Sequence, residues 1–280
     1  MADRFSAFTF VDRITEIEPG TRARGCFNIP DDLPDFSLSL VSEAIGQLTA
    51  WVAMAHLEFR RRPVTGLAGE VRILGTGVPG RMLDLEVAIE SCDDDAVAYG
   101  GWASVGGAPV VKLSRCVGPM LPHEEFDDPE AVRADFETLC GPGAPPGRFR
   151  GVPSPDFGLT DRDPGKRLRG VLQVPASAPL FADHFPRRAV YPGTLLLDSQ
   201  VRLGFQLAGE ARRSNPGASL TPSRVLDLKV RSFILPGQVV ELEAEMLSEA
   251  GGTATAALAA RVGGKLVSTA RAEFIPQESS

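Results

Sequence analysis

The chain has 280 residues, of which 43% are hydrophobic and 23% are charged, and its formal net charge is -7. This length allows two ordinary domains or one large one, and the composition is typical of a soluble globular protein. The negative charge argues against nucleic-acid binding, which needs a basic surface. The first residues show no signal-peptide pattern and no apolar run reaches membrane-span length. We therefore expect a cytoplasmic protein without membrane contact.

Cysteine usage argues against a metal centre. The four cysteines stand at positions 26, 92, 116 and 140, without a C-x-x-C pair and without a histidine at metal-ligand spacing. In a chain expected in a reducing compartment, such cysteines are most simply free thiols. We expect no zinc site and no cofactor.

An internal duplication organises the chain. The pattern of residues 18–30 recurs at 163–175, an offset of 145, and Val-Pro-Gly-Arg at 78–81 recurs as Leu-Pro-Gly-Gln at 235–238, an offset of 157. The Gly-Gly turn at 106–107 recurs at 263–264 with that second offset. Three matches in the same order predict two copies of one domain.

Both copies show the same predicted elements. Residues 83–89 and 240–246 alternate between apolar and polar positions, which is typical of half-buried strands. Residues 40–59 and 194–213 are too long for strands and are apolar over most of their circumference, so each predicts a buried helix. The expected fold class is α+β, with a long central helix wrapped by an antiparallel sheet in each copy.

Between the copies, residues 117–155 are rich in Pro and Gly and read as a linker. Within it, Asp128 as N-cap, Pro129 at the first helical position and a closing Gly141 predict a short helix to about residue 139. We expect His123 to be an exposed loop residue. The predicted organisation is a first repeat at 1–117, a linker at 118–155 and a second repeat at 156–280.

One segment of the second repeat carries the strongest functional signal. His-Phe-Pro at 184–186 is followed by Pro-Gly at 192–193 and by Asp198, fourteen residues after His184. Histidine titrates nearest neutral pH and is the usual side chain for removing and returning a proton. An isolated histidine would more simply satisfy a local hydrogen bond, but these patterned surroundings favour a catalytic role.

These motifs resemble the β-hydroxyacyl-acyl-carrier-protein dehydratases of fatty-acid synthesis, which have the hot-dog fold. The first repeat shows further landmarks of that family, Phe-Val-Asp-Arg at 10–13 and Glu-Ala-Ile-Gly-Gln at 43–47. The resemblance implies a tandem double hot-dog. The sequence departs from the family at Ala189, where proline is usual, and at the Arg187-Arg188 pair. The first repeat also lacks ten residues between Pro30 and Glu43, including the position of a histidine.

In that family, each active site takes its histidine from one hot-dog domain and its acid from the central helix of the other. The resemblance therefore implies one working site, His184 with Glu43, and one vestigial site containing Asp198. Alternatively, both carboxylates are only polar helix residues that bond local backbone.

The resemblance also implies a role for residues near the histidine. Gly193, before the second long helix, matches the position whose backbone N–H stabilises charge on a thioester oxygen. Phe185 and Tyr191 are expected to line an apolar tunnel for the substrate. Phe181 and Phe205 could join them but are more simply core residues. The arginine runs at 187–188 and 60–62 either contact an acidic carrier or form a solvated surface.

The implied reaction is dehydration of 3-hydroxyacyl thioesters, linked to acyl-carrier protein or coenzyme A, to trans-2-enoyl thioesters in fatty-acid or polyketide-type synthesis. An acyl thioesterase on the same fold is the nearest enzyme alternative, and double-bond isomerisation is a weaker one. A non-catalytic acyl-binding or scaffold protein is the alternative from another class. The two repeats are expected to pair within the chain, and a homo-oligomer is possible.

Overall fold

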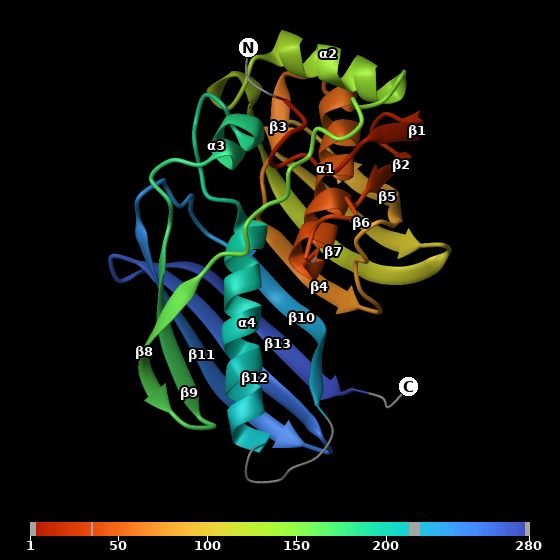
Figure 1. Ribbon diagram of the computed structural model, residues 1–280. Coiled ribbons are helices and arrows are strands. Elements are labelled where there is room, and N and C mark those ends of the chain that lie inside the picture. The colour runs from red at the N-terminus through yellow and green to blue at the C-terminus, as the bar shows by residue number, and fades with distance from the viewer. Residues whose placement is uncertain (1–3, 35, 213–218, 278–280) are drawn as a thin grey trace.

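A computed structural model describes residues 4–34, 36–212 and 219–277. The structure has two halves, each built around one long helix against a strongly curved sheet (Figure 1). It bears out the expected α+β class with two hot-dog units in tandem. The two expected helices are present with ends shifted by one to three residues, and Arg213 lies outside the described residues.

The first half consists of one helix and seven strands. In chain order they are β1 (Arg13–Glu18), β2 (Arg22–Asn28), α1 (Leu38–His56), β3 (Arg61–Pro63), β4 (Leu67–Ile73), β5 (Met82–Cys92), β6 (Ala96–Val105) and β7 (Ala108–Pro122).

The connecting segment and the second half follow. The elements are the short 3₁₀ helix η1 (His123–Glu125), α2 (Pro129–Cys140), β8 (Phe157–Asp163), β9 (Arg167–Gln173), α3 (Pro179–His184), α4 (Gly193–Arg212), β10 (Leu220–Val230), β11 (Val239–Ala250), β12 (Thr253–Val262) and β13 (Lys265–Pro276).

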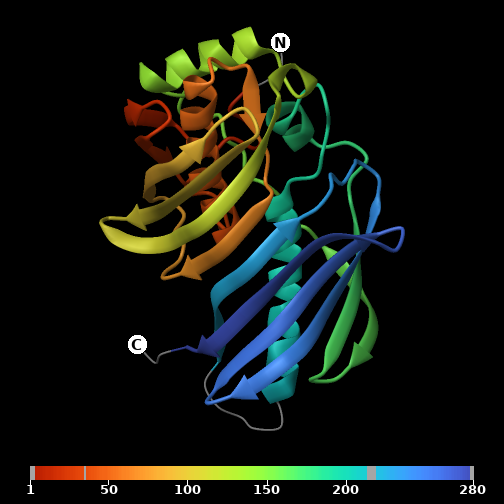
Figure 2. The same cartoon turned by 180° about the vertical axis from the view of Figure 1, so that it is seen from behind.

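A single antiparallel sheet joins the two halves. Its strand order is β1-β2-β5-β6-β7-β4-β10-β13-β12-β11-β9-β8, and β3 pairs with β7 at the side. The junction is the β4–β10 pair, in which Val71 lies opposite Val225. Seen from behind in Figure 2, the strands of both halves continue across this junction. The pairing brings the starts of α1 and α4 together, since Thr194 in α4 bonds Glu43 in α1.

The central helices are core elements. The Ser37 hydroxyl caps α1 by accepting the Leu40 N–H, and most of the helix is buried among the strands. By length and composition α1 could cross a membrane, but most of that stretch lies inside the fold. The four cysteines are free, as the sequence predicted.

The connecting segment is more ordered than its composition suggested. β7 continues to Pro122, five residues into the predicted linker, because Gly118 and Met120 face the core and Pro119 points outward. Helix α2 forms as predicted, with the Asp128 carboxylate accepting the Glu130 N–H.

The prediction for His123 is wrong. Its side chain is fully buried rather than exposed, and neither ring nitrogen makes a hydrogen bond of normal geometry within the described residues. Burial, with the nearby Arg62 charge, lowers the pKa of His123 to about 4.

The two repeats differ most before their central helices. Residues 29–37 join β2 to α1 in the first half, whereas residues 174–192 join β9 to α4 in the second and include α3. The longer connection places His184 at the C-terminal end of α3. The ten-residue difference read from the sequence is therefore a structural difference at the place that supplies the histidine.

Candidate functional site

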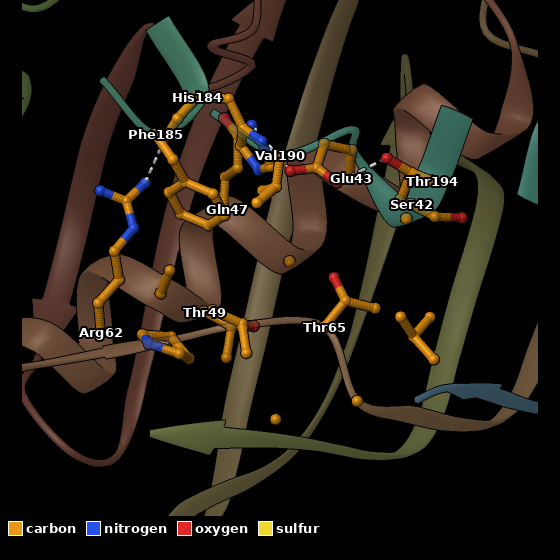
Figure 3. A pocket seen from close by; sticks show the side chains of 18 of the residues that line it. Ser42, Glu43, Gln47, Thr49, Arg62, Thr65, His184, Phe185, Val190 and Thr194 are labelled. Atoms are coloured by element: carbon orange, nitrogen blue, oxygen red, sulfur yellow. Dashed lines mark hydrogen bonds between the residues drawn. The ribbon is translucent and has the colours of Figure 1, made fainter. Parts of the chain in front are cut away.

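A cavity of about 460 Å³ lies at the junction of the two halves. Its walls come from α1 and the adjoining strands of the first half, and from α3, the start of α4 and residues 228–234 of the second. His184 and Glu43 both line it. In Figure 3 their side chains lie at the same end of the cavity, with Gln47 and Val190 beside them. The structure thus brings together two residues 141 positions apart in sequence.

His184 is held mainly by aromatic contacts. Its ring stacks on Phe185 at a centroid distance of 3.9 Å and meets the edge of Phe8 at 4.9 Å. Its backbone carbonyl accepts a 3.1 Å hydrogen bond from Arg62, whose guanidinium also lies over the Phe185 ring. The aromatic packing and this hydrogen bond fix the position of the imidazole in the cavity.

The surroundings keep His184 neutral. Burial, then the charge of Arg62, lowers the pKa of His184 to about 3, although the nearby Val190 carbonyl favours the protonated ring. Nδ1 is out of contact with solvent and makes no hydrogen bond of normal geometry. At neutral pH the ring therefore has a free nitrogen lone pair, which a proton acceptor needs.

Glu43 sits one helical turn into α1 and receives two hydrogen bonds. Gln47 donates to Oε1 at 3.0 Å, and the Thr194 hydroxyl donates to Oε2 at 2.8 Å. Burial raises the pKa of Glu43, while these hydrogen bonds and Arg62 pull it the other way. Gln47 is itself held, since it donates to the Phe8 carbonyl and accepts the Phe10 N–H.

The N-terminal segment is tied to the residue before the histidine. The Asp183 carboxylate accepts the backbone N–H groups of Phe5, Ala7 and Phe8, at 2.7 to 3.0 Å, and the Thr9 hydroxyl at 3.0 Å. This nest of donors joins the two repeats directly beside the cavity. Asp183 directly precedes the His-Phe-Pro segment, but nothing in the sequence revealed this role.

The other predicted cavity residues are placed as follows. Gly193, Phe185 and Tyr191 all line the cavity. Gly193 is the first residue of α4. The Leu196 N–H donates to the Pro192 carbonyl, so the N–H of Gly193, three residues earlier, lies before the helix's own series of backbone hydrogen bonds. Phe181 is buried away from the cavity, and Phe205 is 41% exposed.

Asp198 is not brought to His184. It lines a second cavity of about 720 Å³, which shares only Ser42, Val71 and Leu197 with the first. Its carboxylate lies 4.0 Å from Arg202, one turn further along α4. Arg202 also donates to the Pro155 carbonyl. This second cavity is the pseudo-symmetric counterpart of the first, without a histidine.

For Arg62, the interpretation of residues 60–62 as a solvated surface is wrong, and the alternative of carrier contact stays a prediction. Its side chain is 17% exposed, lines the cavity and lies 3.7 Å from Asp127, which Arg4 also binds. Arg62 lies in β3, six residues after the end of α1, and the sequence offered no signal that distinguished it from the adjoining arginines. Arg187 and Arg188 are exposed and paired locally, with Asp128 and Glu125.

Comparison with known proteins relates this chain to dehydratases. Residues 160–268 match the ApeI-like family, described as ApeI dehydratase. The FabZ 3-hydroxyacyl-[acyl-carrier-protein] dehydratase of Acetivibrio thermocellus is 30% identical over 116 residues, covering 41% of this chain and 79% of that protein. That of Colwellia psychrerythraea is 33% identical, covering 40% and 75%. The chain belongs to this dehydratase family. The family match lies in the second half, which contains His184.

Solved structures match the fold over almost the whole chain. The tesB protein of Mycobacterium avium subsp. paratuberculosis superposes with a TM-score of 0.59, covering 95% of this chain and 96% of that one at 14% identity. An acyl-ACP thioesterase of Bacteroides thetaiotaomicron gives 0.54 at 10% identity, covering 90% and 97%. At such identities the likeness shows the shared double hot-dog fold and nothing about the reaction.

Proposed function

We propose that this protein dehydrates 3-hydroxyacyl thioesters to trans-2-enoyl thioesters, with His184 as the base and Glu43 as the acid. The supporting observation is that these two groups, one from each repeat, line one cavity. Their environments also act on them in opposite senses, since burial lowers the pKa of the imidazole and raises that of the carboxyl. Two groups prepared in this way suit the removal of one proton and the delivery of another.

The reaction balances with these two residues. The neutral His184 ring takes a proton from C2 of the substrate, and the electron pair of that C–H bond forms the C2=C3 double bond. The C3–O bond breaks as Glu43 gives its proton to the leaving hydroxyl, which departs as water. Proton return from His184 to Glu43, directly or through solvent, resets the site.

Charge that develops on the thioester oxygen needs a donor. The Gly193 N–H at the start of α4 is in the cavity wall and at the positive end of the helix dipole. Phe185 and Tyr191 supply apolar wall beside it. The Val190 carbonyl near the His184 ring favours the imidazolium that forms during the reaction.

The substrate is proposed to be linked to acyl-carrier protein or coenzyme A, in fatty-acid or polyketide-type synthesis in the cytoplasm. Arg187 and Arg188 remain candidates for contact with an acidic carrier, since both are exposed. The second cavity, with Asp198, is proposed to be vestigial, so each chain has one working site. The expected division into a repeat at 1–117, a linker at 118–155 and a repeat at 156–280 is proposed with its first boundary moved to residue 122, because β7 of the first repeat continues that far.

The test is incubation with crotonyl and 3-hydroxybutyryl thioesters while enoyl absorbance and free thiol are followed together. We expect interconversion of the two without thiol release. The His184→Ala variant should lose it, and His56→Ala, the same change at an exposed histidine, should not. Thiol release without hydration would instead indicate a thioesterase, and full activity in His184→Ala would favour a binding or scaffold role.

A further inference from the structure

The cavity continues along α1 beyond Glu43. The residues that line it on this helix include Gly46, Gln47, Ala50 and Met54, which follow Glu43 by three, four, seven and eleven positions. Such spacing places them on one face of a helix. The cavity wall beside the proposed acid is therefore a stripe along α1, and two of its members, Gly46 and Ala50, are small.

The facing wall comes from β6 and β7. Val97, Tyr99, Leu113 and Cys116 line the cavity opposite this stripe. A Cβ atom added at Gly46 would lie 3.9 Å from the Tyr99 hydroxyl, which is an ordinary van der Waals distance. The Tyr99 hydroxyl in turn interacts with the Cys116 thiol. The space between α1 and Tyr99 therefore exists because residue 46 has no side chain, and an alanine there would not strain the backbone.

The other central helix lacks this groove. Counting from Asp198 as from Glu43, Val201 stands at the position of Gly46 and Phe205 at that of Ala50. Val201 lines the second cavity, and Phe205 packs against Phe274 and is partly exposed. At these two positions, three and seven residues after the acid, only α1 has small residues.

We propose that the substrate's acyl chain lies in this groove along α1, and that Gly46 facing Tyr99 determines the longest chain the site accepts. This inference rests on the proposed function, because it needs C3 of the substrate, which bears the leaving hydroxyl, at Glu43. At a rise of about 1.5 Å per residue, Gly46 lies about 4.5 Å beyond Glu43 and Ala50 about 10 Å beyond it. With C–C bonds of about 1.5 Å, these spans hold roughly four and eight carbons of extended chain.

The test is the ratio of kcat/KM for 3-hydroxydecanoyl thioester to that for 3-hydroxybutyryl thioester. Gly46→Val, which introduces the α4 residue, should lower this ratio at least tenfold, and Ala50→Phe should lower it by less. Gly46→Ala is the control for misfolding, because alanine favours a helix more than glycine does. This variant should lower the ratio without lowering Tm. The matched control is Gly209→Ala on α4, where an added Cβ meets nothing within 4 Å and the ratio should not change.

An unchanged ratio in both Gly46 variants, or an equal fall with Gly209→Ala, overturns the inference. If the wild-type protein dehydrates neither substrate, the proposed function fails, and binding of butyryl and decanoyl thioesters by calorimetry takes its place. If the wild-type protein binds the decanoyl thioester more tightly than the butyryl thioester and Gly46→Val abolishes this difference, the groove is still supported. Equal affinity of the wild-type protein for the two thioesters would overturn the inference.

Discussion

The starts of α1 and α4 are equivalent positions in two copies of one fold, yet their acids have opposite surroundings. Glu43 in α1 is bonded by the neutral amide of Gln47 and by Thr194, and it shares a cavity with His184. Asp198 in α4 has the cation Arg202 one turn away and no histidine in its cavity. At Glu43 burial outweighs both the neutral donors and the nearby charge of Arg62, so the pKa of the carboxyl is raised and the group can hold a proton. A guanidinium one turn away, as at Asp198, favours the ionised form of a carboxyl.

Gln47 and Arg202 also share a structural task. Each is four residues after its acid and holds a chain segment that enters its repeat, Gln47 at Phe8 and Phe10 and Arg202 at Pro155. After the duplication, the structural role of this position was kept in both repeats, whereas its contact with the acid differs between them. Both positions still anchor backbone, but only Gln47 also bonds an acid that shares a cavity with His184.

The largest expected effect sharpens this comparison directly. Glu43→Gln should lower kcat/KM for dehydration by about 10² to 10⁴, because it removes the proposed acid while keeping its shape. Asp198→Asn, the matched change in the other repeat, should alter it less than about threefold. Steady-state kinetics on a short 3-hydroxyacyl thioester measures both. Equal losses would show that the two sites are not as different as their geometry indicates.

The next effect concerns the connection that only the second repeat has. Asp183→Ala should lower the free energy of unfolding by about 3 kcal/mol, because three backbone N–H groups and a hydroxyl lose their acceptor. Urea denaturation measures it. Asp161→Ala, at an exposed aspartate of β8, is the control and should cost less than about 0.5 kcal/mol. A loss as small as the control's would mean that the N-terminal segment is not anchored there.

Acid sensitivity should also follow the histidine of the second repeat. The folded pKa of His184 is about 3 and its ordinary value is 6.5, so between these values the unfolded chain binds a proton that the folded chain does not. Stability should therefore fall as pH is lowered from about 6.5. In His184→Gln the slope should be smaller by up to about 1.4 kcal/mol per pH unit. Urea titrations at several pH values check this, and His123 contributes a similar slope that the variant retains.

The smallest effect comes from making the second site resemble the first. Arg202→Gln should change kcat/KM for dehydration by less than about twofold, because the second cavity contains no histidine among its lining residues. It should change the free energy of unfolding by less than about 1 kcal/mol, because the ion pair with Asp198 is partly exposed. The same kinetic and urea measurements apply. A clear rise in activity would reveal that the second cavity can still support catalysis.

Several elements could be predicted because their signals are local. The apolar circumference of residues 40–59 and 194–213 predicted both core helices, and Asp128, Pro129 and Gly141 predicted α2. Local signals also misled. Gly118 and Pro119 suggested a linker where β7 continues, and three adjacent arginines suggested a surface where Arg62 is buried. In both places the partner that decides the outcome, β3 or Asp127, lies far away in sequence.

The sequence by itself determined that the chain is a duplication, that only one copy has the His-Phe-Pro segment, and that His184 is the residue to examine. These are matters of residue order and of a ten-residue gap. The pairing of His184 with Glu43 was available beforehand only through the family resemblance, and the tertiary structure places both residues in one cavity without the nearer Asp198. Only the tertiary structure decided that Arg62 and Asp183 support that cavity. The physical reason is the β4–β10 pairing, which brings the starts of two helices together and turns separation along the chain into proximity in space.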